Sequence, residues 1–145
     1  MNYTIRYIEE RDRLDVIEMM RAFYSSDAVF TSGSEEIFEA DVSACISDSP
    51  FIEGYIFEQD GSVQGYAMLA KSFSTEFGKP CIWVEDIYVK SEYRGLGIGG
   101  AFLSYVREKY PDALIRLEVE AENERAVSLY KKFGYEILPY MEMKN

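Results

Sequence analysis

The sequence contains no histidine and few residues of several other kinds. The absence of histidine excludes Ser-His-Asp and Cys-His triads, histidine metal ligands and a histidine general base. The two cysteines, Cys45 and Cys81, are far apart and lack zinc-site spacing, so we expect a reducing compartment, no disulfide framework and no metal. Lys and Arg number 15 against 26 Asp and Glu, which gives a net charge of −11. This charge argues against nucleic acid binding, because phosphates require clusters of Lys and Arg.

Long hydrophobic runs are also absent. No apolar run approaches the roughly 18 residues of a membrane-spanning helix, so no membrane association is expected. The N-terminal stretch MNYTIRYIEERDR carries charges throughout, unlike a signal peptide. These features predict a cytoplasmic protein. Its acidic surface favours cationic ligands, although the same charge also serves solubility.

The 145 residues are typical of one domain, which we expect to span 1–145. Alternating and helical apolar patterns predict the order of elements, with an Asp-Gly hairpin turn at 60–61. The predicted strands cover 3–8, 51–59, 62–72, 81–89, 114–119 and 135–143; the predicted helices cover 9–24, 34–47, a segment from the glycines to about 110, and one capped by Asn123. A hairpin meander followed by strand–helix crossovers predicts an α/β fold with a mixed sheet.

A glycine-rich segment, VKSEYRGLGIGGAFLSYV, lies between a β-branched run and a helical pattern. Its glycines are Gly95, Gly97, Gly99 and Gly100. A strand, a glycine turn and a helix form an anion-binding layout, because the first helical turn leaves backbone N–H groups unpaired. Arg94 adds a guanidinium at the entrance. The segment therefore predicts a pyrophosphate cradle, with a ligand-free turn as the plainer alternative.

Two nucleotide-binding patterns compete for the same residues. The letters G-x-G-x-x-G, followed by Glu120 about 25 residues later, match a dinucleotide site. Five residues, 90–94, separate the predicted strand from the first glycine, and the chain has too few βαβ units for that fold. The Lys-Ser/Thr pair of a P-loop is missing.

Read as R-x-x-G-x-G through Arg94, Gly97 and Gly99, the segment resembles motif A of the GNAT N-acetyltransferase superfamily. The preceding WVEDIYV is similar to the family strand that pairs with pantetheine, and NERAVSLYKKFGY is similar to the family's later N-x-x-A-x-x-L-Y-x-x-x-G-F/Y pattern. Ser91 stands where many members have proline. The resemblance covers nearly the full chain and implies a mixed sheet of about six to seven strands flanked by about four helices.

The resemblance implies that acetyl-CoA is the co-substrate and that no metal is needed. Val89 N–H is expected to donate to the thioester oxygen, and Asn123 to contact pantetheine as well as cap its helix. The implied cofactor-binding residues are Ile87, Tyr88, Val89, Arg94, Gly95, Leu96, Gly97, Ile98, Gly99, Gly100, Asn123 and Tyr130.

Acetyl transfer to an amine requires a base, because deprotonating an alkyl ammonium at pH 7 costs about 4.6 kcal/mol. Glu85 and Asp86 are adjacent on a predicted strand, so they should face opposite sides of the sheet. Similarity to the "EDxxV" strand of polyamine-acetylating relatives favours Glu85 as the base, with Asp86 or a water relay as alternatives. A salt bridge or a role at the strand end is the structural alternative. The resemblance makes Tyr130 the general acid, although its helical stripe also fits a core residue.

The acceptor site is expected where the first two helices meet. The predicted substrate-binding residues are Phe23, Tyr24, Asp27, Phe30, Glu85 and Asp86. This aromatic and acidic mixture suits a cationic amine such as a polyamine or aminoglycoside, although any solvated loop could contain the same residues. Acetylation of a protein N-terminus or lysine, or acyl-CoA binding without turnover, are the alternatives. Homodimers are common in the family, and the sequence does not decide the oligomeric state.

Overall fold

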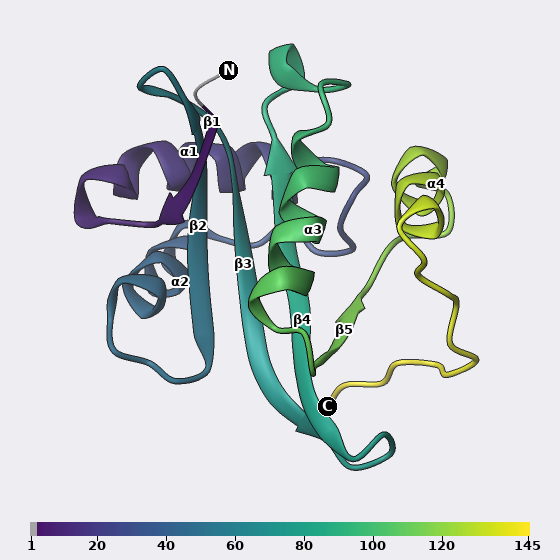
Figure 1. Cartoon of the computed structure of the whole chain (residues 1–145). Coiled ribbons are helices and arrows are strands. Elements are labelled where there is room, and N and C mark those ends of the chain that lie inside the picture. The colour runs from purple at the N-terminus through teal and green to yellow at the C-terminus, as the bar shows by residue number, and fades with distance from the viewer. Residues whose placement is uncertain (1–2) are drawn as a thin grey trace.

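The computed structural model describes residues 3–145 as a mixed sheet with helices on both faces (Figure 1). The elements in chain order are β1 (Tyr3–Tyr7), α1 (Arg13–Tyr24), α2 (Glu35–Ile46), β2 (Ile52–Gln59), β3 (Ser62–Ser74), β4 (Lys79–Val89), α3 (Ile98–Lys109), β5 (Leu114–Leu117) and α4 (Glu124–Lys132). Short 3-10 turns lie at Glu10–Asp12 and Ser91–Tyr93. Within the described range, every helix is too short or too polar to cross a bilayer.

The strands lie in the order β1-β2-β3-β4-β5. The first four are antiparallel, and β5 runs parallel to β4. Asp60 and Gly61 both have positive φ, 50° and 80°, as the tight turn between β2 and β3 requires. The mixed α/β sheet and the hairpin are therefore confirmed, and a sheet with one parallel pair does not have the architecture of a dinucleotide-binding fold.

The expected last strand, 135–143, is not formed. Its residues are assigned to no strand, so the described sheet has five strands instead of the expected six to seven. Alternation of apolar residues indicates that a segment can become a strand, but a strand also requires a neighbouring backbone to pair with. Nothing in the described chain pairs with this segment.

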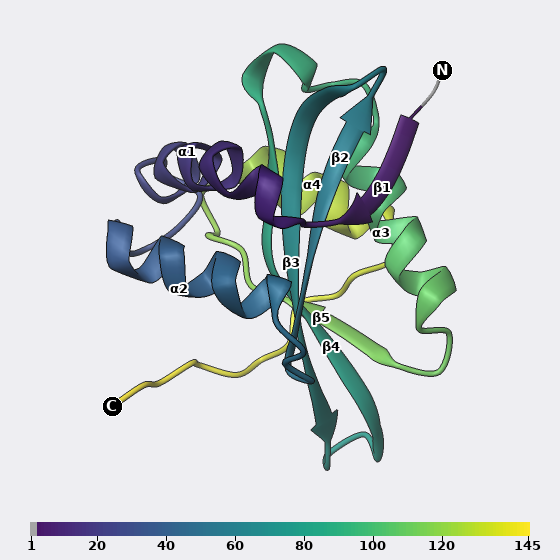
Figure 2. The same cartoon turned by 90° about the vertical axis from the view of Figure 1, so that its left-hand side faces the viewer.

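Two hydrophobic cores lie on opposite faces of the sheet. Helices α1 and α2 cover one face, and α3 lies on the other (Figure 2). The first core includes Met20, Val42 and Tyr66, and the second includes Phe57 and Phe102, all with 0% exposure. The continuous run of buried residues in the middle of β3 follows from this double coverage.

Candidate active site

A bulge in β4 places the two acidic residues of WVEDIYV. Met68 pairs with Asp86, but its neighbour Leu69 pairs with Val84, so Glu85 is an extra residue between them. An extra residue reverses the pleat. Val84 therefore packs in the α3-side core while Asp86, two residues later, contacts side chains of the opposite core.

Asp86 is only 4% exposed. Its two carboxylate oxygens accept hydrogen bonds from Tyr24 Oη at 2.9 Å and Tyr66 Oη at 2.7 Å. Burial raises the pKa of Asp86, while the two hydroxyl donors oppose that rise. The ion-pair alternative does not apply to this residue, because hydroxyl groups occupy both of its oxygens.

Further carboxyl groups surround the bulge. Burial raises the pKa of Asp41 on α2 to about 6, and the charges of Asp86 and Glu85 add to the rise. Burial and the neighbouring charges of Asp86 and Glu142 raise the pKa of Glu85. A hydrogen bond with Glu142, together with burial and the charge of Glu85, raises the pKa of Glu118 to about 7.

These five residues form what we call the acidic cluster: Asp41, Glu85, Asp86, Glu118 and Glu142. None of them takes part in a salt bridge among residues 3–145. In the same range no set of three or more acidic or cysteine side chains is arranged to hold a metal ion. The cluster is thus a region of negative charge without a cation of its own.

Sequence reasoning missed Asp41, Glu118 and Glu142. Asp41 is one of five carboxylates in or next to α2, and no local pattern distinguishes it from its neighbours. Its proximity to β4 arises only when the helix packs across the sheet.

The glycine segment folds as a turn leading into α3. Gly95 and Gly97 have φ of 80° and 85°, a left-handed conformation that side chains disfavour. A Cβ on Gly100 would lie 2.6 Å from the Phe133 ring of α4. Three of the four glycines are therefore required by the fold itself.

Gly99 differs from the other glycines in the segment. A Cβ there would meet only Leu129 at 3.5 Å and Ile87 at 4.0 Å, which are ordinary contacts. The first hydrogen bond of α3 runs from the Ala101 N–H to the Gly97 carbonyl. The N–H groups of residues 98–100 therefore have no carbonyl partner within the helix. Leu96 is 62% exposed beside them. The turn thus offers backbone donors suitable for an anion.

The end of β4 has an unpaired edge. Its parallel pairing with β5 ends at Val84 and Leu117, so residues 85–89 have no partner strand on that side among the described residues. Arg94 Nε donates to the Val89 carbonyl at 2.8 Å, and its guanidinium lies 5.4 Å from the centre of the Tyr88 ring. This contact holds Arg94 between the open edge and the glycine turn.

Helix α4 carries the two remaining candidates. Asn123 Oδ1 accepts from the Ala126 N–H at 3.3 Å, which confirms its role as the helix cap. Tyr130 is half-buried, and its ring packs edge-on against Tyr135 at 6.0 Å. Burial and the neighbouring Tyr135 raise the pKa of Tyr130 to about 12, so its hydroxyl stays protonated at neutral pH.

The expected acceptor residues do not all come together. Tyr24 reaches Asp86, as described, whereas Phe23 is a core residue packed against the rings of Tyr66 and Tyr88. Phe30 is 90% exposed, and Asp27 is exposed on the same loop. The structure thus joins Tyr24 with the acidic cluster and leaves Asp27 and Phe30 on the surface.

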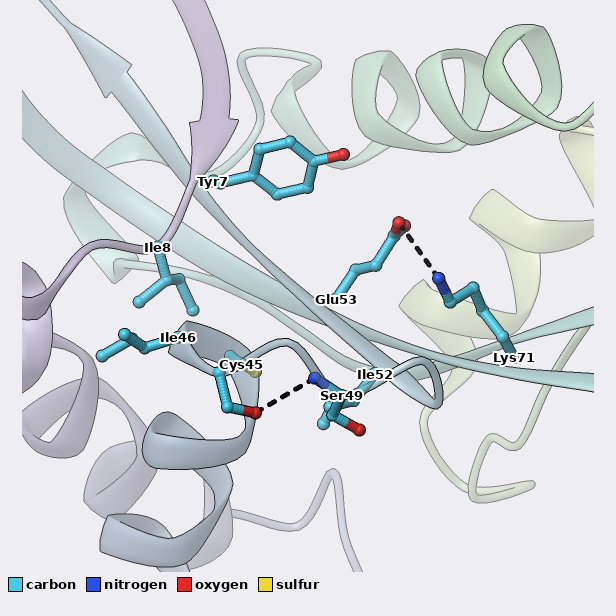
Figure 3. A pocket seen from close by; sticks show the side chains of 9 residues that line it. Tyr7, Ile8, Cys45, Ile46, Ser49, Ile52, Glu53 and Lys71 are labelled. Carbon is cyan, nitrogen blue, oxygen red and sulfur yellow. Dashed lines mark hydrogen bonds and ion pairs between the residues drawn. The ribbon is translucent and has the colours of Figure 1, made fainter.

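Two pockets lie away from these groups. One, of about 300 Å³, is lined by Tyr7, Ile8, Cys45, Ile46, Ser47, Ser49, Ile52, Glu53 and Lys71 (Figure 3). Its two charged groups, Glu53 and Lys71, pair with each other at 3.5 Å. The other, of about 230 Å³, lies between α1 and the segment after β4. Neither pocket is lined by Glu85, Asp86 or Tyr130. The candidate site therefore lies at the bulge of β4 and outside both pockets.

Sequence comparison identifies relatives over most of the chain. The model of a family described as "Acetyltransferase (GNAT) family" matches residues 15–135. A bovine (Bos taurus) protein named thialysine N-epsilon-acetyltransferase is 34% identical over 95% of this chain and 86% of its own length. An N-alpha-acetyltransferase of Sulfurisphaera tokodaii is 36% identical over 56% of this chain and 54% of its own length.

Solved structures share the fold at low identity. A possible acetyltransferase from Clostridium difficile 630 superposes with a TM-score of 0.83 at 18% identity, covering 100% of this chain and 97% of that one. The protein AAC(6')-Iy, in complex with a bisubstrate analogue, CoA-S-monomethyl-acetylneamine, gives 0.82 at 13% identity over 100% and 98%. These likenesses concern the fold alone.

Proposed function

Because the chain belongs to the GNAT family of acetyltransferases, we propose that it transfers the acetyl group of acetyl-CoA directly to a primary amine of a small cationic molecule. The observation that carries this proposal is the acidic cluster, whose members lack a salt-bridge partner among the described residues. Burial raises the pKa values of Asp41 and Asp86, which makes their ionised forms costly to the folded protein, and a bound ammonium group offsets that cost. The thialysine substrate in the name of the bovine relative is also an amine.

The residues present suit acetyl-CoA, which supplies an acyl thioester and a pyrophosphate. The N–H groups at the start of α3 and the guanidinium of Arg94 are suited to the pyrophosphate. The unpaired edge of β4 at residues 85–89 suits an extended amide-bearing arm. A Cβ on Gly97 would meet nothing within 4 Å, so there is room for close approach to this backbone.

In the proposed reaction, Glu85 takes a proton from the substrate ammonium, directly or through water. The neutral nitrogen then bonds to the thioester carbonyl carbon while the carbon–sulfur bond breaks. The Tyr130 hydroxyl gives its proton to the leaving sulfur. The raised pKa of the Glu85 carboxyl moves it toward neutral pH, which suits a general base. The raised pKa of the Tyr130 hydroxyl keeps it protonated, so that it has a proton to give.

Asp86 has a positioning role in this proposal. Its oxygens are both held by tyrosine hydroxyls, so it is poorly placed to take a proton itself. Its negative charge raises the pKa of Glu85, which makes Glu85 a stronger base. It also attracts the substrate cation.

The test is release of free thiol from acetyl-CoA in the presence of a panel of amines. We expect turnover with at least one diamine or other dibasic amine and loss of turnover in Glu85→Gln. A thermal-shift titration with acetyl-CoA, desulfo-CoA and NADH accompanies it, in which only the CoA ligands should stabilise the protein. The absence of a shift with either CoA ligand would reject acetyl-CoA as co-substrate.

The same assay separates the alternatives. Turnover with peptides that carry a free N-terminus or a lysine, and with no small amine, would establish a protein substrate. Stabilisation by acetyl-CoA without thiol release for any amine or peptide would indicate an acyl-CoA-binding module.

A further inference from the structure

Strand β1 covers only part of the outer edge of β2. Beyond the end of β1, the Ile8 N–H donates to the Gly54 carbonyl at 3.0 Å. On the inner edge of β2, the Lys71 N–H donates to the Phe51 carbonyl at 2.8 Å. Backbone groups alternate between the two edges of a strand, so the N–H and C=O of Ile52 point outward, as those of Gly54 do. No backbone group of residues 3–145 bonds to Ile52 on that side, so the outer edge of β2 is open at this single residue.

The pocket of about 300 Å³ lies beside this open edge (Figure 3). Its apolar wall consists of Ile8, Cys45, Ile46 and Ile52. Burial, together with nearby carboxylates, raises the pKa of the Cys45 thiol to about 12, so the thiol is neutral and belongs to this wall. The volume is at the lower end of the range of small-molecule sites. The pocket therefore suits a small ligand with an apolar part.

Glu53 and Lys71 bring one negative and one positive charge to the same pocket. Figure 3 shows them pointing toward each other, but the 3.5 Å between Glu53 Oε2 and Lys71 Nζ is longer than a hydrogen bond. Glu53 Oε1 accepts from the hydroxyls of Tyr55 at 2.8 Å and Tyr110 at 2.6 Å. Glu53 Oε2 has only Lys71 and, at 3.6 Å, Lys109 near it among the described residues. Glu53 Oε2 and the Lys71 ammonium group thus both retain hydrogen-bonding capacity for a ligand.

We propose that this pocket binds a free α-amino acid with an apolar side chain. The carboxylate accepts from the Ile52 N–H and from Lys71. The ammonium group donates to the Ile52 carbonyl and to Glu53, so that the ligand bonds to Ile52 as an opposing residue does in an antiparallel pair. The apolar side chain packs against Ile8 and Ile46. This site is separate from the acidic cluster, and the inference is independent of the proposed acetyl transfer.

The two charges and the length of the open edge both favour a single amino acid. An amine without a carboxylate leaves Lys71 without an acceptor, and a carboxylate without an ammonium group lies beside Glu53 with no cation of its own. A zwitterion satisfies both groups with charge-assisted hydrogen bonds. A peptide strand needs several open positions in a row, whereas the edge at Ile52 offers one.

Isothermal titration calorimetry without acetyl-CoA tests the proposal with L-leucine, isoamylamine and isocaproate. Isoamylamine lacks the carboxylate of leucine, and isocaproate lacks its ammonium group. We expect the wild-type chain to bind leucine at least about tenfold more tightly than either. Lys71→Met should weaken leucine binding by about tenfold or more. Lys79→Met should leave it unchanged, because Lys79 is exposed on the same hairpin and does not line the pocket.

A second pair of variants tests the open edge. Ile52 is the first residue of β2, a position at which a strand tolerates proline. Ile52→Pro removes the N–H that is proposed to hold the carboxylate and should weaken leucine binding by about tenfold. Ile52→Ala keeps the N–H and should weaken it less. Circular dichroism and urea unfolding verify that each variant folds.

Leucine is also an amine, so the acidic cluster is a competing site. Glu85→Gln should retain the wild-type affinity for leucine. Loss of leucine binding in Glu85→Gln but not in Lys71→Met would place the amino acid in the acidic cluster and overturn the proposal. A wild-type chain that binds none of leucine, valine and methionine would also overturn it. Equal affinity for leucine and for either isoamylamine or isocaproate would do the same, because one of the two charges would then be unnecessary.

Discussion

At the scale of single residues, the site is defined by carboxyl groups that the fold holds at some cost. Asp86 receives two hydroxyl donors, but Asp41 and Glu85 have raised pKa values, caused first by burial and then by the nearby charge of Asp86. Burying like charges together lowers the stability of the folded state. Such groups are typical of functional sites, where stability is traded for binding.

Removing one of these groups should therefore stabilise the protein in a pH-dependent way. The pKa of Asp41 is about 6 in the folded state against an ordinary 3.8, so its ionisation disfavours folding increasingly as pH rises from about 4 to about 6, and fully above that. We expect Asp41→Asn to have a higher free energy of unfolding than wild type at pH 7.5 and an equal one near pH 4. Urea unfolding at several pH values measures the difference. If the difference in free energy of unfolding does not shrink toward pH 4, the pKa of Asp41 is not raised in the folded state.

Glu85 is predicted to limit the reaction itself. Replacing the base with an amide of the same shape should lower kcat by about 10²–10⁴-fold. In the wild-type enzyme, kcat/KM should fall at low pH as Glu85 is protonated, with an apparent pKa above the ordinary value for glutamate. The pH profile of Glu85→Gln should lose that limb. Its acetyl-CoA-induced thermal shift should be retained, which separates a loss of catalysis from a loss of folding.

At the scale of elements, the glycine segment does two things. It offers backbone donors suitable for an anion, and it lets α3 pack closely against the end of α4. Gly100 allows α3 to approach Phe133 of α4, and Arg107 of α3 donates to the Phe133 carbonyl at 2.8 Å. Tyr130 lies on α4, so the packing of α4 on α3 also sets where its hydroxyl lies. Gly100 thus influences the position of Tyr130, the proposed general acid, through helix packing.

Alanine at the two neighbouring glycines should have opposite effects on stability. Gly99→Ala meets only ordinary contacts and gains helix propensity of up to about 1 kcal/mol. Gly100→Ala would collide with the Phe133 ring and should cost about 1–3 kcal/mol. Urea unfolding of both variants tests this. Replacing the ring with a smaller side chain, in Gly100→Ala/Phe133→Leu, should recover part of the lost stability. If stability does not recover, the collision with the ring is not the cause of the loss.

At the scale of the whole molecule, the net charge of −11 acts on every cationic substrate that approaches. Fields of this kind raise association rates and are screened by salt, with a Debye length of about 10 Å at 0.1 M. The acidic cluster concentrates this charge at the bulge of β4, between the two cores.

The salt dependence of the reaction should reveal this contribution. For a dication, kcat/KM should fall several-fold between low and high ionic strength, whereas for a monoamine it should fall less, because fewer charges are screened. Steady-state kinetics in increasing NaCl measure both. The thermal shift with acetyl-CoA at each salt concentration is the control for effects on the co-substrate. A dication and a monoamine with the same salt dependence would argue against recognition of the second charge.

The sequence by itself determined the order and type of the elements as far as α4, the hairpin at Asp60-Gly61, the capping role of Asn123 and the family. These depend on local periodicity, turn chemistry and motif spacing. It placed Glu85 and Asp86 on the right strand. Only the tertiary structure decided that Glu85 is the extra residue of a bulge, because a bulge is a mismatch between two strands.

Tertiary structure also decided which other acids join the site. Asp41, Glu118 and Glu142 are far apart in sequence, and only the fold of the chain brings their carboxyl groups near Glu85. Only the tertiary structure shows that Gly100 is needed because the Phe133 ring lies against it. Only the tertiary structure shows that no strand forms at 135–143. The conformational preference of a residue depends on its neighbours in sequence. A steric collision, the interaction of two charges or the pairing of two strands depends on a second segment, whose position in space the sequence does not give.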